Sequence, residues 1–228
     1  MTSSDPLSVL FAILRRDLIL AFRSGGGWFY ALFFFAVFTA LAAIAFGPSL
    51  NALAIAAPAT LWLAVALAIQ FSASDLFEND LRDGSLRVIA SEQTGLMTYW
   101  GAKVCVMSLT SVFPMVIASP FFLTMLGLSF TQGLGVSLIL LIGVPSLIFI
   151  AVLTSALATG LRAGGLLAMV IAVPFSAPVL VFAVSATKAL LAGFGIITPE
   201  SLILGAISLF MAVLTPAFTV AALRVSLE

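Results

Sequence analysis

The charged residues of this chain are concentrated between Phe71 and Trp100. The chain has nine acidic and nine basic side chains, and seven of these, five acidic and two basic, lie in this stretch. Carboxylates that recur every two or three residues are able to share general acid–base work, so a catalytic pair is conceivable here. The stretch is expected to be a solvated loop outside any pocket, however, and this argues against catalysis. We instead predict a docking platform for a soluble partner, the alternative being an ordinary loop between two membrane helices.

The local signals within this stretch predict two short segments. Ser74 is able to cap a helix that carries Asp75 and Glu78 in its first turn. Asp83-Gly84 predicts a turn, and Ser85 is able to begin the second segment. We expect an acidic excess there to match basic residues of the partner. The predicted contact residues are Asp75, Glu78, Asp80, Arg82, Asp83, Gly84, Ser85 and Arg87.

Several kinds of chemistry lack their residues in this chain. It contains no histidine, which excludes histidine-based metal sites, general bases and haem ligands. It has neither a glycine-rich loop ending in Lys-Ser or Lys-Thr nor a GxGxxG motif, so no nucleotide site is predicted. The single cysteine, Cys105, excludes a disulfide within the chain and is expected to be buried. We therefore predict a non-catalytic chain that binds no metal and no cofactor of its own, and whose energy comes from a bound ATPase.

The composition indicates which elements must position the charged stretch. With 63% hydrophobic and only 8% charged residues, the chain could not cover a soluble globule with polar surface. It contains six apolar runs that approach or exceed the roughly 20 residues needed to cross a bilayer. We predict an all-α membrane domain over residues 1–228, with spans at 28–46, 52–71, 100–125, 134–159, 166–187 and 201–223. A cytoplasmic coupling loop would occupy 72–99.

Residues 5–23 predict a helix of another kind. Its apolar residues recur every three or four positions but are interrupted by Arg15, Arg16 and Arg23. Such a helix is too charged to span a bilayer, but it suits the membrane interface with its arginines near phosphate. A helix packed on a soluble core is the alternative.

Prolines interrupt each of the last four predicted spans. Each removes a backbone donor and bends its helix, so these positions are either moving hinges or static kinks. They are Pro114, Pro120, Pro145, Pro174, Pro178 and Pro216.

The distribution of cations predicts the orientation of the chain. In a six-span arrangement, eight of the nine Lys and Arg residues fall on one side and only Lys188 falls on the other. Because cytoplasmic loops are enriched in Lys and Arg, we predict that both termini and the charged loop are cytoplasmic.

Three stretches of the sequence resemble the CcmB family, the haem exporter B proteins. The first runs from Arg15 to Gly26, and the second joins Leu76 and Asp80 to Leu86, followed by Ala102-Lys103. The third runs from Gly160 to Leu166 and on to the segment from Pro174 to Phe182. They are spaced across nearly the whole chain, and their order is fairly specific to the family. One departure is that Val104-Cys105-Val106 stands where many relatives carry a histidine and a tryptophan.

The resemblance implies an ABC-2-like permease subunit in the bacterial inner membrane that serves c-type cytochrome biogenesis. The implied partners are a CcmA-like ATPase, which binds ATP, CcmC-like and CcmD-like membrane proteins, and a CcmE-like haem chaperone. Haem would be handled by the complex, either by export or by release of the haem-loaded chaperone, and the lack of histidine favours release. The alternatives are a permease of this architecture for a lipid, polysaccharide or drug, and a passive assembly scaffold.

Overall fold

A computed structural model describes residues 6–23, 27–91, 95–161 and 163–227. These residues form helices and connecting turns without any strand. Six of the helical stretches are long and apolar enough to cross a membrane. The predicted all-α, six-span architecture is therefore confirmed.

The helices follow one another with short connections. An amphipathic helix comes first, and two short helices interrupt the series of long ones. The bounds are α1 Pro6–Arg23, α2 Gly27–Phe46, α3 Leu50–Ala73, α4 Glu78–Arg82, α5 Ser85–Ala90, α6 Gly95–Met107, the π-helical segment η1 Ser108–Val112, α7 Phe113–Met125, α8 Phe130–Ala158, α9 Gly164–Leu191 and α10 Pro199–Val225.

The long helices form a bundle around α3 and α8, which are the most buried of the spans. Helix α8 packs against α7, α9 and α10, and α3 packs against α2 and α9. Small residues on α3 and α9 lie at four-residue spacing and are buried, among them Ala64 and Ala68 on α3 and Ala172 on α9. In lipid, small side chains allow helix backbones to approach closely. The indole of Trp62 on α3 also donates a hydrogen bond to Thr187 Oγ1 on α9, at 2.9 Å.

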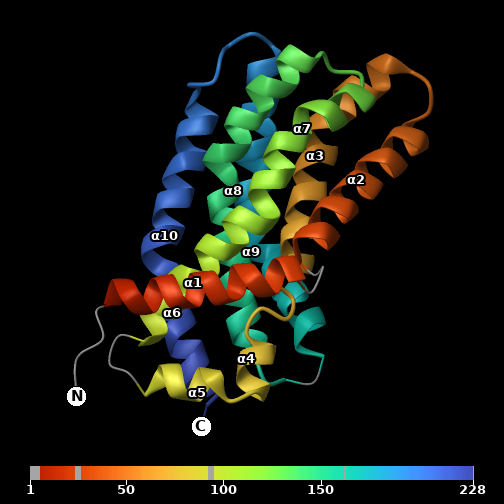
Figure 1. The fold of residues 1–228 in the computed structure, drawn as a ribbon. Helices are drawn as coiled ribbons and strands as arrows, with labels where there is room; N and C mark the ends of the chain where they lie inside the picture. The colour runs from red at the N-terminus through yellow and green to blue at the C-terminus, as the bar shows by residue number, and fades with distance from the viewer. Residues whose placement is uncertain (1–5, 24–26, 92–94, 162, 228) are drawn as a thin grey trace.

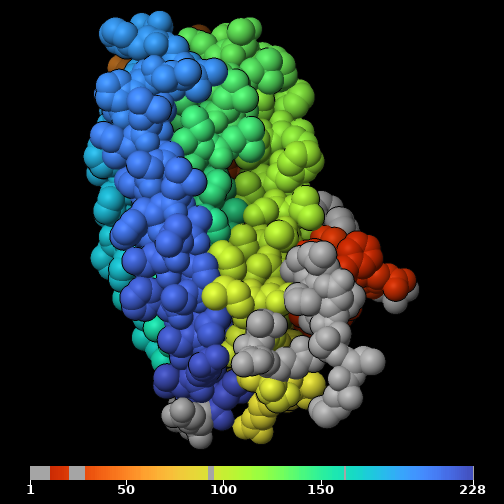
Figure 2. Space-filling view, turned by 90° about the vertical axis from the view of Figure 1, so that its left-hand side faces the viewer, coloured from red at the N-terminus to blue at the C-terminus, as the bar shows by residue number. Residues whose placement is uncertain are grey.

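The charged elements gather at one end of the bundle. Figure 1 shows α4, α5 and the ends of the chain at the bottom, with the connections α2–α3, α7–α8 and α9–α10 at the top. Helix α1 runs across the long helices near the lower end and packs on α6. In Figure 2 it projects sideways from the lower part of the molecule, as a helix lying along a membrane surface would.

The third span is not one regular helix. Between α6 and α7, the five residues of η1 adopt the wider π-helical turn, and the N–H of Phe113 bonds to the carbonyl of Ser108. Pro114 follows directly in the first turn of α7. Because Pro114 has no N–H, the Thr110 carbonyl would lack its usual α-helical donor, and a π turn accommodates such a gap. The other five predicted kink prolines all lie inside helices, and whether they move stays a prediction.

Two local predictions are wrong. Ser74 does not cap α4: it ends α3, and its hydroxyl donates to the Phe71 carbonyl at 2.9 Å. Helix α4 begins only at Glu78 because turn residues follow Ser74. Cys105 is exposed on α6 rather than buried. In a membrane helix an apolar side chain gains nothing by turning inward, since lipid is also apolar.

Candidate functional site

A network of paired charges joins three elements at the lower end of the bundle. Arg16 donates through Nε to Asp17 Oδ1 at 2.8 Å and through Nη2 to Asp80 Oδ1 at 2.7 Å. Lys103 Nζ lies 2.8 Å from Asp17 Oδ2 and 2.7 Å from Asp80 Oδ2. The Tyr99 hydroxyl donates a short hydrogen bond to Asp80 Oδ2. These five residues are called the charge network below.

Because most of the charge network is buried, its ion pairs matter for the stability of the fold. Asp17, Asp80 and Lys103 are only 7%, 6% and 7% exposed. Two carboxylates face two cations, so the group is neutral as a whole. Removing one partner from such a buried group leaves an uncompensated charge, which is strongly destabilising. For Arg16, partial burial opposes the charge, but hydrogen bonding to Asp17 and the charges of Asp17 and Asp80 raise its pKa above the ordinary value.

Helical spacing places these side chains on facing surfaces. Ile13 and Asp17 are buried one turn apart on α1, and Tyr99 and Lys103 are buried one turn apart on α6. Residues four apart lie on one face of a helix, so both pairs face the α1–α6 contact. Asp80 is contributed by α4 and is the only buried residue of that helix.

Glu78 attaches α4 to another part of the bundle. Its Oε2 accepts a hydrogen bond from the backbone N–H of Gly160 at 3.1 Å, and its Oε1 pairs with Arg82 at 3.1 Å. Gly160 lies in the α8–α9 connection and has a φ of +80°, a conformation that favours glycine. A cavity of about 160 Å³ lies between this connection and the α3–α4 turn.

The outward face of α4 and α5 differs from the expected one. Glu78 and Asp80 bind residues of their own chain, whereas Arg82, Asp83, Arg87 and Val88 are exposed. Among the described residues, the outward charge is therefore mixed and not acidic, which contradicts the expected acidic surface. The reason is that the two carboxylates find cations and a free N–H within the fold.

The turn between the two short helices has the predicted form. Gly84 has a φ of +80°, and Asp83 Oδ1 accepts from the Ser85 hydroxyl at 2.6 Å and from its backbone N–H at 2.9 Å. The two hydrogen bonds from Ser85 lower the pKa of Asp83 below its ordinary value. The buried Leu86 anchors α5 to the bundle.

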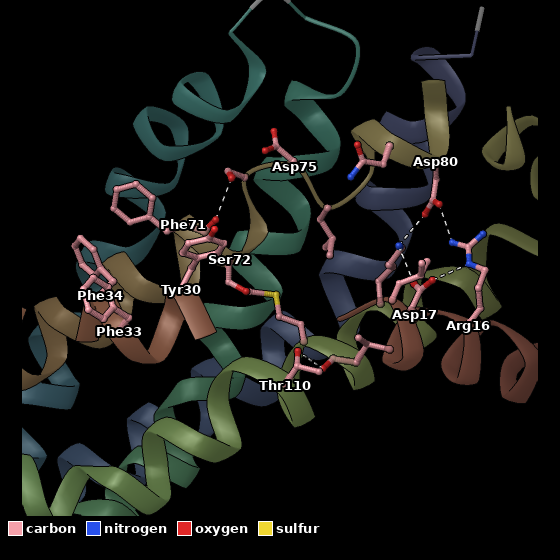
Figure 3. Close-up of a pocket in the computed structure, with 17 residues that line it drawn as sticks. Arg16, Asp17, Tyr30, Phe33, Phe34, Phe71, Ser72, Asp75, Asp80 and Thr110 are labelled. Atoms are coloured by element: carbon pink, nitrogen blue, oxygen red, sulfur yellow. Dashed lines mark hydrogen bonds and ion pairs between the residues drawn. The ribbon is translucent and has the colours of Figure 1, made fainter. Parts of the chain in front are cut away.

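A cavity of about 630 Å³ opens beside the charge network. Figure 3 shows aromatic side chains from α2 and the end of α3 at one side of it, Asp17, Arg16 and Asp80 at the other, and Asp75 between them. The cavity is therefore apolar at one end and charged at the other. The sequence predicts no pocket beside these carboxylates, because residues of α1, α2 and α6 complete the cavity only in the folded chain.

The structure brings only part of the predicted site together. Arg16 and Asp80 meet in the charge network, Arg15 is exposed on α1, and the Arg23 side chain lies outside the described residues. Asp17, Tyr99 and Lys103 were missed as site residues. A signal for them exists in the sequence, because an Asp and a Lys stand at positions of α1 and α6 where the apolar spacing calls for an inward residue.

Comparison with known proteins gives a consistent result over nearly the whole chain. The protein-family model described as "CcmB protein" matches residues 8–226 of this chain. The chain is 38% identical over 225 residues to heme exporter protein B of Bradyrhizobium diazoefficiens, covering 97% of this chain and 100% of that protein. It is 34% identical to heme exporter protein B of Rhodobacter capsulatus over 95% of this chain and 99% of that protein. The corresponding protein of Escherichia coli K12 is 33% identical over 96% and 100%.

Proposed function

Because this chain belongs to the CcmB family, we propose that it is the membrane subunit of a haem exporter, driven by a separate ATPase in the bacterial inner membrane. The proposed setting is c-type cytochrome biogenesis, with CcmA-, CcmC-, CcmD- and CcmE-like partners. Relatives named heme exporter protein B at 33–38% identity and nearly full coverage support it. The chain has no glycine-rich nucleotide loop, so the ATP would bind to the partner.

The attachment of α4 to three other elements is the observation that carries this proposal. Asp80 links α4 to α1 and α6 through the charge network. Glu78 links the same helix to the α8–α9 connection. A displacement of α4 would therefore be passed to the interfacial helix, the third span and the base of α8 and α9. Rigid-body shifts of packed helices are a common way of transmitting such a movement.

The exposed face of α4 and α5 is the proposed contact with the ATPase. Arg82 and Arg87 offer positive charge, and Val88 is 71% exposed as an apolar contact. Charges at the rim of an interface chiefly set encounter rate and register, while apolar contacts add affinity. We expect the partner surface to carry carboxylates opposite the two arginines.

The lack of histidine bears on the chain's role toward haem. Histidine, the commonest protein ligand of haem iron in globins and peroxidases, does not occur in the 228 residues. This favours a subunit that couples ATP hydrolysis to release of a haem-loaded chaperone over one that binds haem iron itself.

The contact is tested by reversing an outward charge. The variant Arg87→Glu should reduce co-purification of the ATPase with the membrane subunit several-fold, because an attractive pair becomes repulsive. Arg224→Glu is the matched control, an exposed arginine at the same end but on α10. Unchanged co-purification of Arg87→Glu, at normal levels of membrane-inserted protein, would refute the contact. Arg82 is left unchanged because it pairs with Glu78. Glu78 and Asp80 are unsuitable for this test because reversing them would break internal bonds.

A further inference from the structure

The 630 Å³ cavity beside the charge network has the two-part character of an amphipathic ligand site. Phe33, Phe34 and Phe71 line its apolar end, and Arg16 and Asp75 belong to its charged side. Its volume falls within the range of about 300–1,000 Å³ typical of small-molecule sites. The ATPase contact proposed above does not use this cavity, so the inference stands independently of it.

The charged side still has unused binding capacity. A guanidinium has five N–H donors, and the two bonds of Arg16 to Asp17 and Asp80 occupy one on Nε and one on Nη2. The Arg16 side chain is 36% exposed, so its remaining donors are accessible. Asp75 is exposed and makes no ion pair with another described residue. The described lining carries two cations and three carboxylates, which leaves one negative charge in excess.

The position of the cavity points to a lipid. It lies between the interfacial helix α1 and the first span α2, and the lining side chains Tyr30 and Phe33 on α2 are 64% and 56% exposed. Aromatic residues at this depth stand where headgroups meet acyl chains. The cavity lining also contains the ring of Tyr30 and the carboxylate of Asp75, and each favours an organic cation, because the face of the ring and the carboxylate both attract positive charge.

We propose that this cavity binds one phospholipid whose headgroup carries both a phosphate and an ammonium group. Arg16 binds the phosphate through its free N–H donors, and Asp75 binds the ammonium group. The acyl chains lie along Phe33, Phe34 and Phe71. A purely anionic lipid would leave Asp75 facing like charge, and a purely cationic ligand would leave the Arg16 donors unused.

The test measures which phospholipid binds to the purified full-length protein. The protein is depleted of lipid in detergent, and binding of phosphatidylethanolamine and phosphatidylglycerol is followed by native mass spectrometry. We expect one phosphatidylethanolamine per chain, and Asp75→Asn should weaken its binding about five- to tenfold, because a charged hydrogen bond is lost. Glu200→Gln, the same change at the opposite end of the bundle, is the control.

A second pair of variants examines the apolar end of the site. Phe71→Ala should weaken binding by a similar factor, whereas Phe113→Ala should not, since Phe113 is 57% exposed but lies outside the cavity lining. Equal binding by Asp75→Asn and the unsubstituted protein would overturn the proposal. So would an equal or greater affinity for phosphatidylglycerol, or the absence of any binding of phosphatidylethanolamine to the depleted protein.

Discussion

At the scale of single residues, Asp80 determines how α4 is held. Its two carboxylate oxygens interact with Arg16 on α1 and with Tyr99 and Lys103 on α6. Taking an ion out of water costs several kcal/mol, and the cost is offset only where its partners are in place. The ionised carboxylate therefore holds α4 against two other helices in one arrangement.

Replacing Asp80 with asparagine should destabilise the protein by about 3 kcal/mol, because the buried Lys103 and the partly buried Arg16 would share only Asp17. The measurement is thermal unfolding of the detergent-solubilised protein, followed by the loss of its monodisperse elution. The control is Asp83→Asn, three residues further on. Asp83 is exposed, and the amide oxygen of asparagine is still able to accept the two Ser85 hydrogen bonds, so this variant should elute and unfold like the unsubstituted protein. If Asp80→Asn and Asp83→Asn were equally stable, the charge network would not contribute to the stability of the fold.

The sequence alone predicts that Asp80 matters but not in which direction it points. A charged residue within 72–99 is expected to be solvated, because the segment is predicted to be a loop. The cations that pair with Asp80 are also distant in sequence: Arg16 lies 64 residues before it and Lys103 lies 23 residues after it. Only the packing of α1 on α6 brings these groups together. The predicted acidic outer surface was wrong for this reason, whereas the turn at Gly84 could be predicted because its signals are local.

At the scale of elements, the backbones of α7 and α8 pack in close contact. A Cβ built on Gly133 would lie 2.8 Å from Pro120 Cα, which leaves no room for a methyl group. Nearby, the hydroxyls of Ser119 and Ser137 lie 2.8 Å apart. Backbone contact and hydroxyl bonds of this kind drive helix association where lipid provides no hydrophobic force.

Substituting Gly133 with alanine should therefore force α7 and α8 apart and cost about 1–3 kcal/mol of stability, as overpacking typically does. Gly101→Ala is the comparison, because a Cβ there meets nothing within 4 Å and alanine favours a helix by about 1 kcal/mol over glycine. In the same detergent, the unfolding temperature should fall for Gly133→Ala and rise for Gly101→Ala, each relative to the unsubstituted protein. A Gly133→Ala protein as stable as Gly101→Ala would contradict the close packing.

The spans could be predicted because about 20 consecutive apolar residues have few alternatives to a membrane helix. Their interruptions could not. Pro114 signals a disturbed helix, but the choice between a bend and the π turn of η1 depends on which carbonyls find donors after packing. The sequence is equally unable to show which helix Ser74 borders. Its side chain is of a type that begins helices, but α3 continues as far as Ala73, so Ser74 stands at the end of α3.

At the scale of the whole molecule, the proposed function requires that the protein lies in the membrane in one orientation. Helices α4 and α5 and the two chain ends lie at one end of the bundle, and the α9–α10 connection lies at the other. The excess of Lys and Arg on the α4–α5 side predicts that this end faces the cytoplasm. An ATPase supplied with cellular ATP is able to reach α4 and α5 only in that orientation.

The most direct test of this central claim is labelling of single cysteines in intact cells with a membrane-impermeant maleimide. The chain's own thiol is first removed as Cys105→Ser, and Val88→Cys on α5 or Ile197→Cys before α10 is then introduced, at positions 71% and 81% exposed. We predict that the cysteine at position 197 is labelled from outside the cytoplasmic membrane and that the one at position 88 is labelled only after permeabilisation. Labelling at position 88 in intact cells, with position 197 protected, would contradict the proposed drive from the cytoplasm.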